Sequence, residues 1–237
     1  GSDVLISQTP AYQVAYNILC KSELSAAMAS GENVTLAFFD DSTGDGFATT
    51  GWTANPTSGG EAVGNSNHNL TSPNSYTVKI EAILRDMFGN NNIRTFNAGY
   101  AGKSIADGWA LRNYDAAITN NPFYGTPTAT FIGFGLNDVR PSGSQTSDFR
   151  EQLEQLIDKV RGYGTLPILL TCDPIMRNFD TTNAIYNREV LLQLDEVRRE
   201  VAASKKVPLI DKGELLNGWA NNNRDGYRWF IEQSTDT

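Results

Sequence analysis

The sequence is poor in the side chains on which most metal and redox chemistry depends. Its 237 residues include one histidine, two cysteines and three methionines. Cys20 and Cys172 lie far apart and each sits among apolar neighbours, and no His/Cys spacing typical of a metal site is present. We therefore predict two ordinary buried thiols rather than a redox pair, and neither a metal ion nor another cofactor.

Basic residues and long apolar runs are also scarce. The chain has 19 Lys and Arg against 27 Asp and Glu, a net charge of −8 and a pI near 4.7. No basic run is present, which argues against binding to nucleic acid or to an anionic membrane. No segment approaches the roughly 20 apolar residues of a spanning helix, and no signal peptide is visible. We therefore expect a soluble chain that uses neither partner.

What the sequence does contain is a regular alternation of short apolar runs with segments of helical periodicity. Strands that alternate with helices indicate a mainly parallel sheet covered on both faces, so we predict a three-layer α/β/α sandwich of the flavodoxin-like kind with a five-stranded sheet. The predicted strands are 35–39, 93–97, 129–134, 166–171 and 207–210. The predicted helices are 76–88, 147–163 and 184–204, with a further helix within 11–28.

The length suits one domain, which we divide into a lead-in helix at 1–32 and the domain proper at 33–237. The segment 49–74 is long and rich in Gly, Ser, Thr and Asn, a pattern typical of functional loops. Two glycosylation sequons, at Asn33 and Asn69, arise often by chance and receive little weight.

A serine on a sharp turn is the most reactive-looking feature of the chain. The apolar run at 34–39 ends abruptly in Asp40, Asp41 and Ser42. Open α/β folds place their sites at the carboxyl ends of strands, so Ser42 is a candidate nucleophile that needs a base and oxyanion donors. The two acids could alternatively begin a magnesium-dependent phosphatase of the haloacid dehalogenase type. That chemistry wants D-x-D, however, and the third position is Ser42, so Asp41 is expected to brace the turn.

Two further blocks follow the next two predicted strands: NAGYAG at 97–102 and GFGLND at 133–138. Together with the serine turn, and in this order, they resemble the SGNH (GDSL-type) hydrolases. That family has a G-D-S block, an N-x-G-x-x-G block and a G-x-N-D block after its first three strands. The resemblance runs from about residue 35 to the end and implies the SGNH fold and a serine esterase.

The resemblance and the residue chemistry agree on an oxyanion hole. Its donors would be the backbone N–H of Ser42, the backbone N–H of Gly102 and the side-chain amide of Asn137. Glycine lets the backbone approach the oxygen, and an amide is a donor whose charge does not change with pH. Trp52 and Tyr100 border the blocks, and their aromatic faces make them candidate contacts to a sugar ring.

The base is where the sequence departs from the family, which uses a D-x-x-H block near the end of the domain. Asp236 matches the acid, and the histidine then falls two positions beyond Thr237. We expect the chain to stop before its own base, with the histidine supplied by a further C-terminal fragment or domain of the same protein. The one histidine present, His68, is a substitute candidate, although a lone loop histidine is typically exposed and inert.

A second departure is Asp40, which stands where the family has glycine. The extra negative charge beside the nucleophile calls for a partner, such as Lys103 or Arg140.

These observations favour a serine esterase acting on O-acetyl or other acyl esters of a carbohydrate. The polar loop, the acidic composition and the absence of an apolar lid helix favour an acylated carbohydrate over a lipid substrate. The missing histidine motivates an alternative, a non-catalytic glycan-binding or structural module on the same scaffold. A lipase or thioesterase of the family is a second alternative. Phage tail proteins also carry such domains. The opening Gly1-Ser2 and the early end suggest a piece of a larger protein, extracellular or virion-associated.

Overall fold

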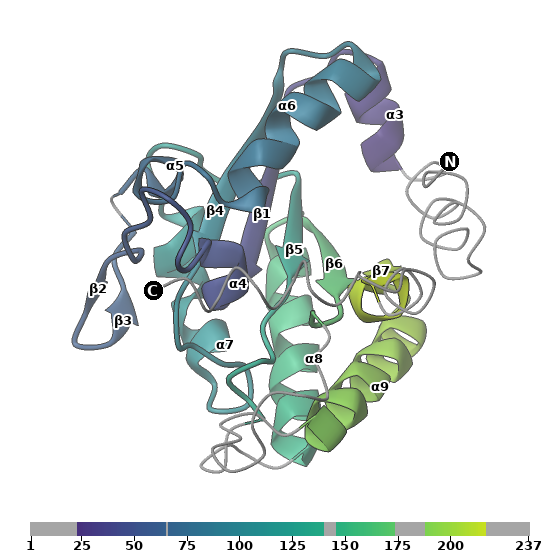
Figure 1. Cartoon of the computed structure of the whole chain (residues 1–237). Coiled ribbons are helices and arrows are strands. Elements are labelled where there is room, and N and C mark those ends of the chain that lie inside the picture. Colours follow the sequence, from purple (N-terminus) through teal and green to yellow (C-terminus); the bar gives the residue numbers. More distant parts are fainter. Residues whose placement is uncertain (1–22, 65, 140–145, 174–187, 217–237) are drawn as a thin grey trace, which may run out of the picture.

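A five-stranded parallel sheet forms the centre of the protein in a computed structural model that describes residues 23–64, 66–139, 146–173 and 188–216. The strand order is β4-β1-β5-β6-β7, so the first strand of the sheet lies between the two that follow it in the chain (Figure 1). The strands are β1 (Val34–Asp40), β4 (Ile93–Gly99), β5 (Ala129–Ile132), β6 (Leu166–Leu170) and β7 (Leu209–Ile210).

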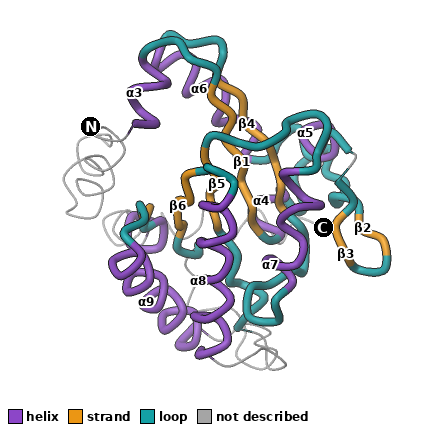
Figure 2. The backbone as a smooth tube through the Cα atoms, turned by 180° about the vertical axis from the view of Figure 1, so that it is seen from behind, coloured by secondary structure: helices purple, strands orange, loops and turns teal. Residues whose placement is uncertain are grey.

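Helices cover both faces of the sheet, as the predicted three-layer α/β/α sandwich requires (Figure 2). One layer holds α3 (Glu23–Ala29) and α6 (Tyr76–Phe88). The other holds α7 (Trp109–Tyr114) with the π-helical turn η1 (Asp115–Thr119), α8 (Thr146–Gly162) and α9 (Arg188–Lys205). The prediction of the fold class is confirmed.

Strand β1 shows why the sheet is covered twice. Its side chains alternate between the faces, as the strand period of two demands. Ala37 and Phe39 join the core under α7, α8 and α9, whereas Leu36 and Phe38 join the core under α3 and α6. Since nearly every side chain of β1 is buried, the strand is a continuous apolar run in the sequence.

The predicted elements are found with small shifts at their ends. Strand β5 ends at Ile132 rather than at 134, and α9 is described from Arg188 on. The segment 49–74 is not a structureless loop, because it contains the hairpin β2 (Thr57–Ser58) and β3 (Glu61–Ala62) and the short helix α5 (His68–Thr71). Cys172 is buried, as predicted, while Cys20 and most of 11–28 lie outside the described residues.

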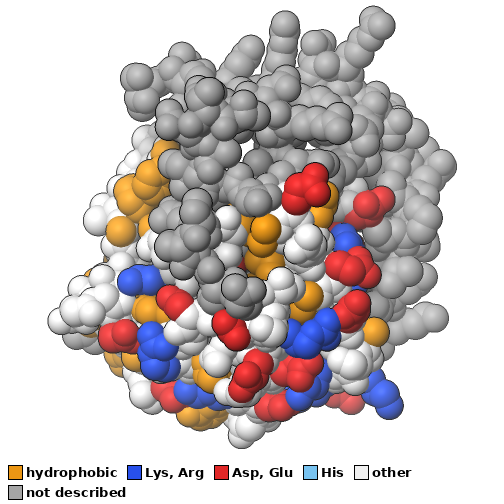
Figure 3. All heavy atoms as spheres, turned by 90° about the horizontal axis from the view of Figure 1, so that it is seen from below, with side chains coloured by type: hydrophobic (Ala, Val, Ile, Leu, Met, Phe, Trp, Pro, Cys, Tyr) orange, Lys and Arg blue, Asp and Glu red, His pale blue; other side chains and the backbone are white. Residues whose placement is uncertain are grey.

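Charged side chains of both signs are interspersed on the described part of the face seen from below (Figure 3). Ion pairs link α8 to α9, among them Lys205 to Asp158 at 2.7 Å and Arg150 to Glu200. These exposed pairs contribute little stability individually. They do show that side chains of both signs lie on the surface of these two helices.

Strand β4 lies at the edge of the sheet, and side chains satisfy its outward-facing backbone groups. Such an edge otherwise offers a row of unpaired N–H and C=O groups to another chain. From the Ile93 carbonyl to the Gly99 carbonyl, each outward group is bonded to a side-chain atom. The partners are Arg85, Glu81, Asn69, His68, Asn97 and Asn55, at donor–acceptor distances between 2.5 and 3.1 Å.

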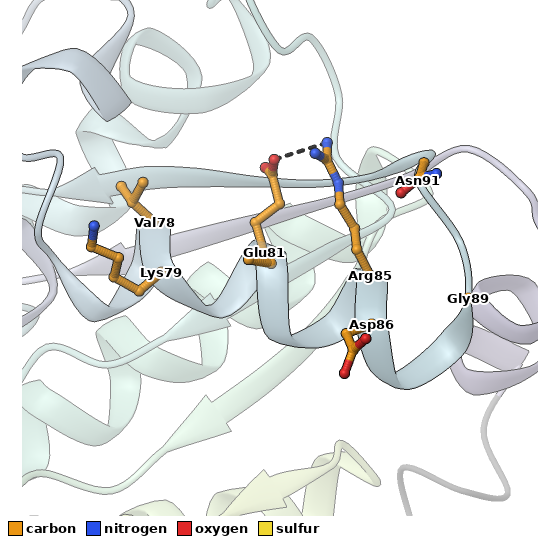
Figure 4. A pocket seen from close by; sticks show the side chains of 8 residues that line it. Val78, Lys79, Glu81, Arg85, Asp86, Gly89 and Asn91 are labelled. Carbon is orange, nitrogen blue, oxygen red and sulfur yellow. Dashed lines mark ion pairs between the residues drawn. The ribbon is translucent and has the colours of Figure 1, made fainter.

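A hollow on the outer side of α6 belongs to this edge (Figure 4). Glu81 and Arg85 cross it as an ion pair of 2.8 Å, one helical turn apart. Glu81 accepts the N–H of Thr95, and Arg85 donates to the carbonyl of Ile93. The ion pair in the hollow is thus engaged with β4. None of its lining residues comes from the three sequence blocks.

Candidate active site

Ser42 begins a one-turn helix, α4 (Ser42–Asp45), directly after the central strand β1. Asp41 is its N-cap: one carboxylate oxygen accepts from the N–H and the hydroxyl of Thr43, both at 3.0 Å. The other oxygen accepts the N–H of Leu136 at 3.2 Å. Asp41 therefore braces the turn as predicted, and it also ties the serine block to the block that follows β5.

Gly102 lies in the loop after β4, in the second block. It is exposed, and its φ of +76° is a left-handed conformation that favours glycine. No atom lies within 4 Å of the place where a Cβ would be. The loop therefore leaves open space at the position expected to donate to an oxyanion.

Asn137 follows β5 and is 7% exposed. Its Nδ2 donates to the Lys103 carbonyl at 2.9 Å, and because a carbonyl only accepts, this bond fixes which end of the amide faces Lys103. One hydrogen of Nδ2 remains for another acceptor. The next residue, Asp138, accepts the N–H groups of Ile105 and Ala106, the latter at 2.7 Å. The third block is thus bonded directly to the loop that carries Gly102.

A buried ion pair on α9 packs against the third block. Arg198 on α9 is 1% exposed and donates to Asp195 at 2.6 Å. Asp195 also accepts the N–H of Cys172. The guanidinium lies so close to Gly135 that a Cβ there would collide with it. Sequence reasoning missed this support. Its only local signal is the i, i+3 spacing of the two charges on a helix that is otherwise apolar on that face.

Asp40 is fully buried, and two glycines make room for it. A Cβ on Gly44 or on Gly133 would collide with the Asp40 side chain. The carboxylate accepts from the Tyr76 hydroxyl at 2.9 Å and from the N–H of Asp41 at 2.8 Å. Where the family has a glycine, this chain has the larger Asp40, and the lack of a side chain at these two glycines makes room for it.

The positive charge that acts on Asp40 is that of Lys212, so the predicted partner Lys103 is wrong. Burial raises the pKa of Asp40, and the nearby Lys212 charge offsets part of that rise. The ion pair of Lys212 is with Asp173, at 3.4 Å. Lys103 points elsewhere, since its Nζ donates to the Gly60 carbonyl at 2.8 Å. Arg140, the other predicted partner, lies outside the described residues.

Tyr100 belongs to the core, which corrects its predicted role as a substrate contact. It is 1% exposed, and its ring packs against Trp109 at 5.1 Å and His68 at 5.5 Å between centroids. Trp52, the other predicted contact, is half-buried, and its indole N–H donates to Asp45 at 3.0 Å.

His68 is buried rather than exposed, which corrects the expectation for a loop histidine. Its Nδ1 donates to the Asn97 carbonyl at 3.1 Å, and its Nε2 lies 3.4 Å from the Tyr100 hydroxyl. Burial lowers the pKa of His68 to about 4, so the ring is neutral at pH 7. Both ring nitrogens are thus engaged at the β4 edge and neither contacts Ser42. Asp236 lies outside the described residues.

Metal ligands and membrane spans are both absent from the described part of the chain. Within those ranges, no three His, Cys, Asp or Glu side chains are grouped as metal ligands would be. Over the same residues, every helix is too short or too polar to span a bilayer.

The arrangement of the three blocks agrees with a family comparison. The model of the GDSL-like lipase/acylhydrolase family matches residues 41–231, which is most of the chain. The protein belongs to this family of hydrolases.

Solved structures share the fold. The tail fiber protein gp63.1 from an E. coli phage superposes with a TM-score of 0.68 at 22% identity, over 86% of this chain and 24% of that one. The acetyl xylan esterase AlAXEase gives 0.57 at 18% identity, over 82% and 84% of the two chains. A lipase/acylhydrolase from Enterococcus faecalis gives 0.56 at 18% identity, over 84% and 92%.

A curated relative is the uncharacterized lipoprotein YqeF of Bacillus subtilis (strain 168). It is 29% identical over 140 residues, which cover 51% of this chain and 55% of that protein. The chain therefore spans about half the length of this relative and about a quarter of the phage protein.

Proposed function

We propose that the protein is a serine esterase that removes O-acetyl groups from a saccharide. The observation that carries the proposal is the position of Ser42. It stands at the carboxyl end of the central strand, and hydrogen bonds join its turn to the Asn137 block and that block to the Gly102 loop. Membership of the acylhydrolase family supports the reaction class.

The reaction follows from these groups. Ser42 Oγ attacks the acyl carbon and gives its proton to a histidine. The negative oxygen of the tetrahedral intermediate accepts from the N–H groups of Ser42 and Gly102 and from the free Nδ2 hydrogen of Asn137. The intermediate then collapses, the protonated histidine gives its proton to the departing sugar oxygen, and water hydrolyses the acyl-enzyme by the same steps.

The histidine is proposed to lie in the D-x-x-H block that Asp236 begins, supplied by a further segment of the parent protein. His68 is a poor candidate, because its Nδ1 proton is held by the Asn97 carbonyl and its ring is neutral and buried. A second candidate function is a glycan-binding module without catalysis. It is favoured because both ring nitrogens of His68 already have partners, so this histidine is not available as a base. A lipase or thioesterase is the alternative within the family.

The saccharide half of the proposal is supported by the fold shared with an acetyl xylan esterase and with a phage tail fiber protein. The polar segment 49–74 beside the serine turn suits a hydrated substrate. We propose an extracellular or virion-associated location, in line with the tail fiber protein and the lipoprotein among the similar proteins.

The test is acetate release from partly acetylated oligosaccharides by the full-length protein. Ser42→Ala is expected to lower turnover by more than about 1,000-fold. Ser58→Ala, on the exposed strand β2, is the matched control and should leave turnover unchanged. Release that persists in Ser42→Ala contradicts the nucleophile assignment. Saccharide binding without any acetate release by the unmodified protein favours the binding module.

A further inference from the structure

We propose that Phe47 and Trp52 form an aromatic corner that binds a pyranose ring of the acylated saccharide next to Ser42. This inference rests on the proposed function, because it specifies the part of the same site that holds the sugar. The aromatic corner is defined by these two side chains alone.

Phe47 is exposed, and its backbone is hydrogen-bonded to that of Ser42. Its side chain is 60% exposed, although it is large and apolar. Its backbone N–H donates to the Ser42 carbonyl at 3.0 Å. Because Trp52 packs against it, this phenyl ring is part of an exposed aromatic pair beside the candidate nucleophile rather than an isolated apolar side chain.

The ring of Trp52 packs against the ring of Phe47. The two ring centroids are 4.8 Å apart, and the ring planes meet at 68°. The Trp52 indole N–H donates to Asp45, the last residue of α4, and its backbone N–H donates to the Thr49 carbonyl at 3.0 Å. Asp45 is buried. The Trp52 ring is thus anchored to the helix that Ser42 begins, and the Phe47 ring packs against it, so the corner is formed before a ligand arrives.

The shape and surroundings of the corner suit a sugar. A pyranose ring has an apolar C–H face with a rim of hydroxyl groups, so it can cover one aromatic ring while its edge meets the other. The neighbouring residues Ala48, Thr50 and Thr53 are small or polar and exposed, which leaves the hydroxyl rim in water or beside threonine. A long acyl chain would require a continuous apolar groove instead. Because the rings are already ordered, binding loses little side-chain entropy.

The backbone of Ala48, in the turn between the two rings, is left-handed. Its φ is +63°, which is unusual for a residue with a Cβ. The turn between the two rings is therefore held by its surroundings in a conformation that its own sequence does not favour. This conformation places the exposed ring of Phe47 on the same short turn as Trp52.

The kinetic test compares Phe47→Ala and Trp52→Ala with the unmodified full-length protein. On partly acetylated xylo-, manno- and chito-oligosaccharides we expect KM to rise about 5- to 10-fold with kcat nearly unchanged. With ethyl acetate, which has no sugar ring, KM should stay the same. Met87→Ala removes a side chain that is 68% exposed on α6, and is the matched control that should change neither constant.

A binding test separates failure of the corner from failure of the proposed function. Ser42→Ala protein should bind at least one oligosaccharide of the panel, and adding Phe47→Ala should weaken that binding about 5- to 10-fold by calorimetry, whether or not the unmodified protein releases acetate. Trp52→Phe keeps a ring and should weaken binding less than Trp52→Ala. Binding that is absent from the whole panel or unchanged by Phe47→Ala overturns the inference. A KM effect confined to vinyl octanoate would assign the corner to an acyl chain and overturn it too.

Discussion

The side-chain amide of Asn137 donates to the main-chain carbonyl of Lys103 at 2.9 Å. Gly102 immediately precedes Lys103, so this one bond couples two of the three proposed oxyanion donors. The bond therefore fixes the Asn137 amide relative to the Gly102 loop, as a preorganised oxyanion hole requires.

Removing the amide should affect the transition state more than the bound substrate. Asn137→Ala is expected to lower turnover by about 100- to 1,000-fold with little change in KM, because the oxyanion exists mainly in the transition state. Initial rates on an acetylated oligosaccharide measure this. Asn92→Ala, at an exposed position, is the control. An unchanged turnover would remove Asn137 from the oxyanion hole.

Asp138 should act as a positioning residue for the same hole. Asp138→Ala frees the N–H groups of Ile105 and Ala106, and is expected to cost about 2 kcal/mol of unfolding free energy and to lower turnover. Asp138→Asn retains one acceptor and should restore part of the turnover. Urea denaturation and initial rates provide the two readouts, with the exposed Asp158→Ala as the control. Equal turnover in all of these proteins would show that the loop does not need the bond.

The charges of Asp40 and Lys212 should be coupled, because the Lys212 charge offsets part of the rise in the pKa of Asp40. Lys212→Met removes a positive charge that favours the Asp40 carboxylate and breaks the ion pair with Asp173, and is expected to cost about 1 to 3 kcal/mol in urea denaturation. Adding Asp40→Asn should recover a large part of this loss, because the uncompensated charge is then gone. Lys79→Met, on the exposed side of α6, should cost almost nothing. Strict additivity of the two substitutions would contradict this coupling.

His68 should make the protein sensitive to acid. Its pKa is about 4 in the folded protein and 6.5 in the unfolded chain, so the unfolded state binds the extra proton first as the pH falls. Stability is therefore lost as the pH drops from 6.5 towards 4, by about 3 kcal/mol in total. His68→Gln should lack this loss.

The measurement is the difference between the two urea-denaturation curves across that pH range. The difference is required because burial raises the pKa of Asp45 to about 7, which changes stability in the opposite sense in both proteins. Parallel stability profiles for His68→Gln and the unmodified protein would show that the histidine is not held neutral.

The sequence predicts the sheet and the three blocks well, because each is a local pattern. An apolar run followed by Asp41 and Ser42 places the serine at a strand end without knowledge of any distant residue. The role of His68 depends on Asn97, which is 29 positions away, and no local periodicity carries that contact. For the same reason the sequence alone predicts an exposed loop position for this histidine, and the structure shows a buried one at the sheet edge.

The cation that acts on Asp40 is a second feature that the sequence alone does not predict. The sequence shows that a partner is required, and Lys103 is the nearest basic residue in a neighbouring block. The order of strands would favour Lys103, because β4 is next to β1 and β7 is three strands away, so the choice of cation depends on where the side chains point. Lys212 follows β7, far along the chain, and its charge lies close enough to Asp40 to favour the ionised carboxylate. Gly44 and Gly133 leave the space that Asp40 fills, and they are the feature of the sequence that corresponds to this burial.

The row of side chains along β4 has a consequence for copies of the domain held close together. A strand from a neighbouring copy would have to displace Arg85, Asn69 and His68 before it found a free backbone group on this edge. Crowding of copies therefore offers no template for sheet-to-sheet growth through β4. The domain can be displayed at high density on this side without its copies fusing into one sheet.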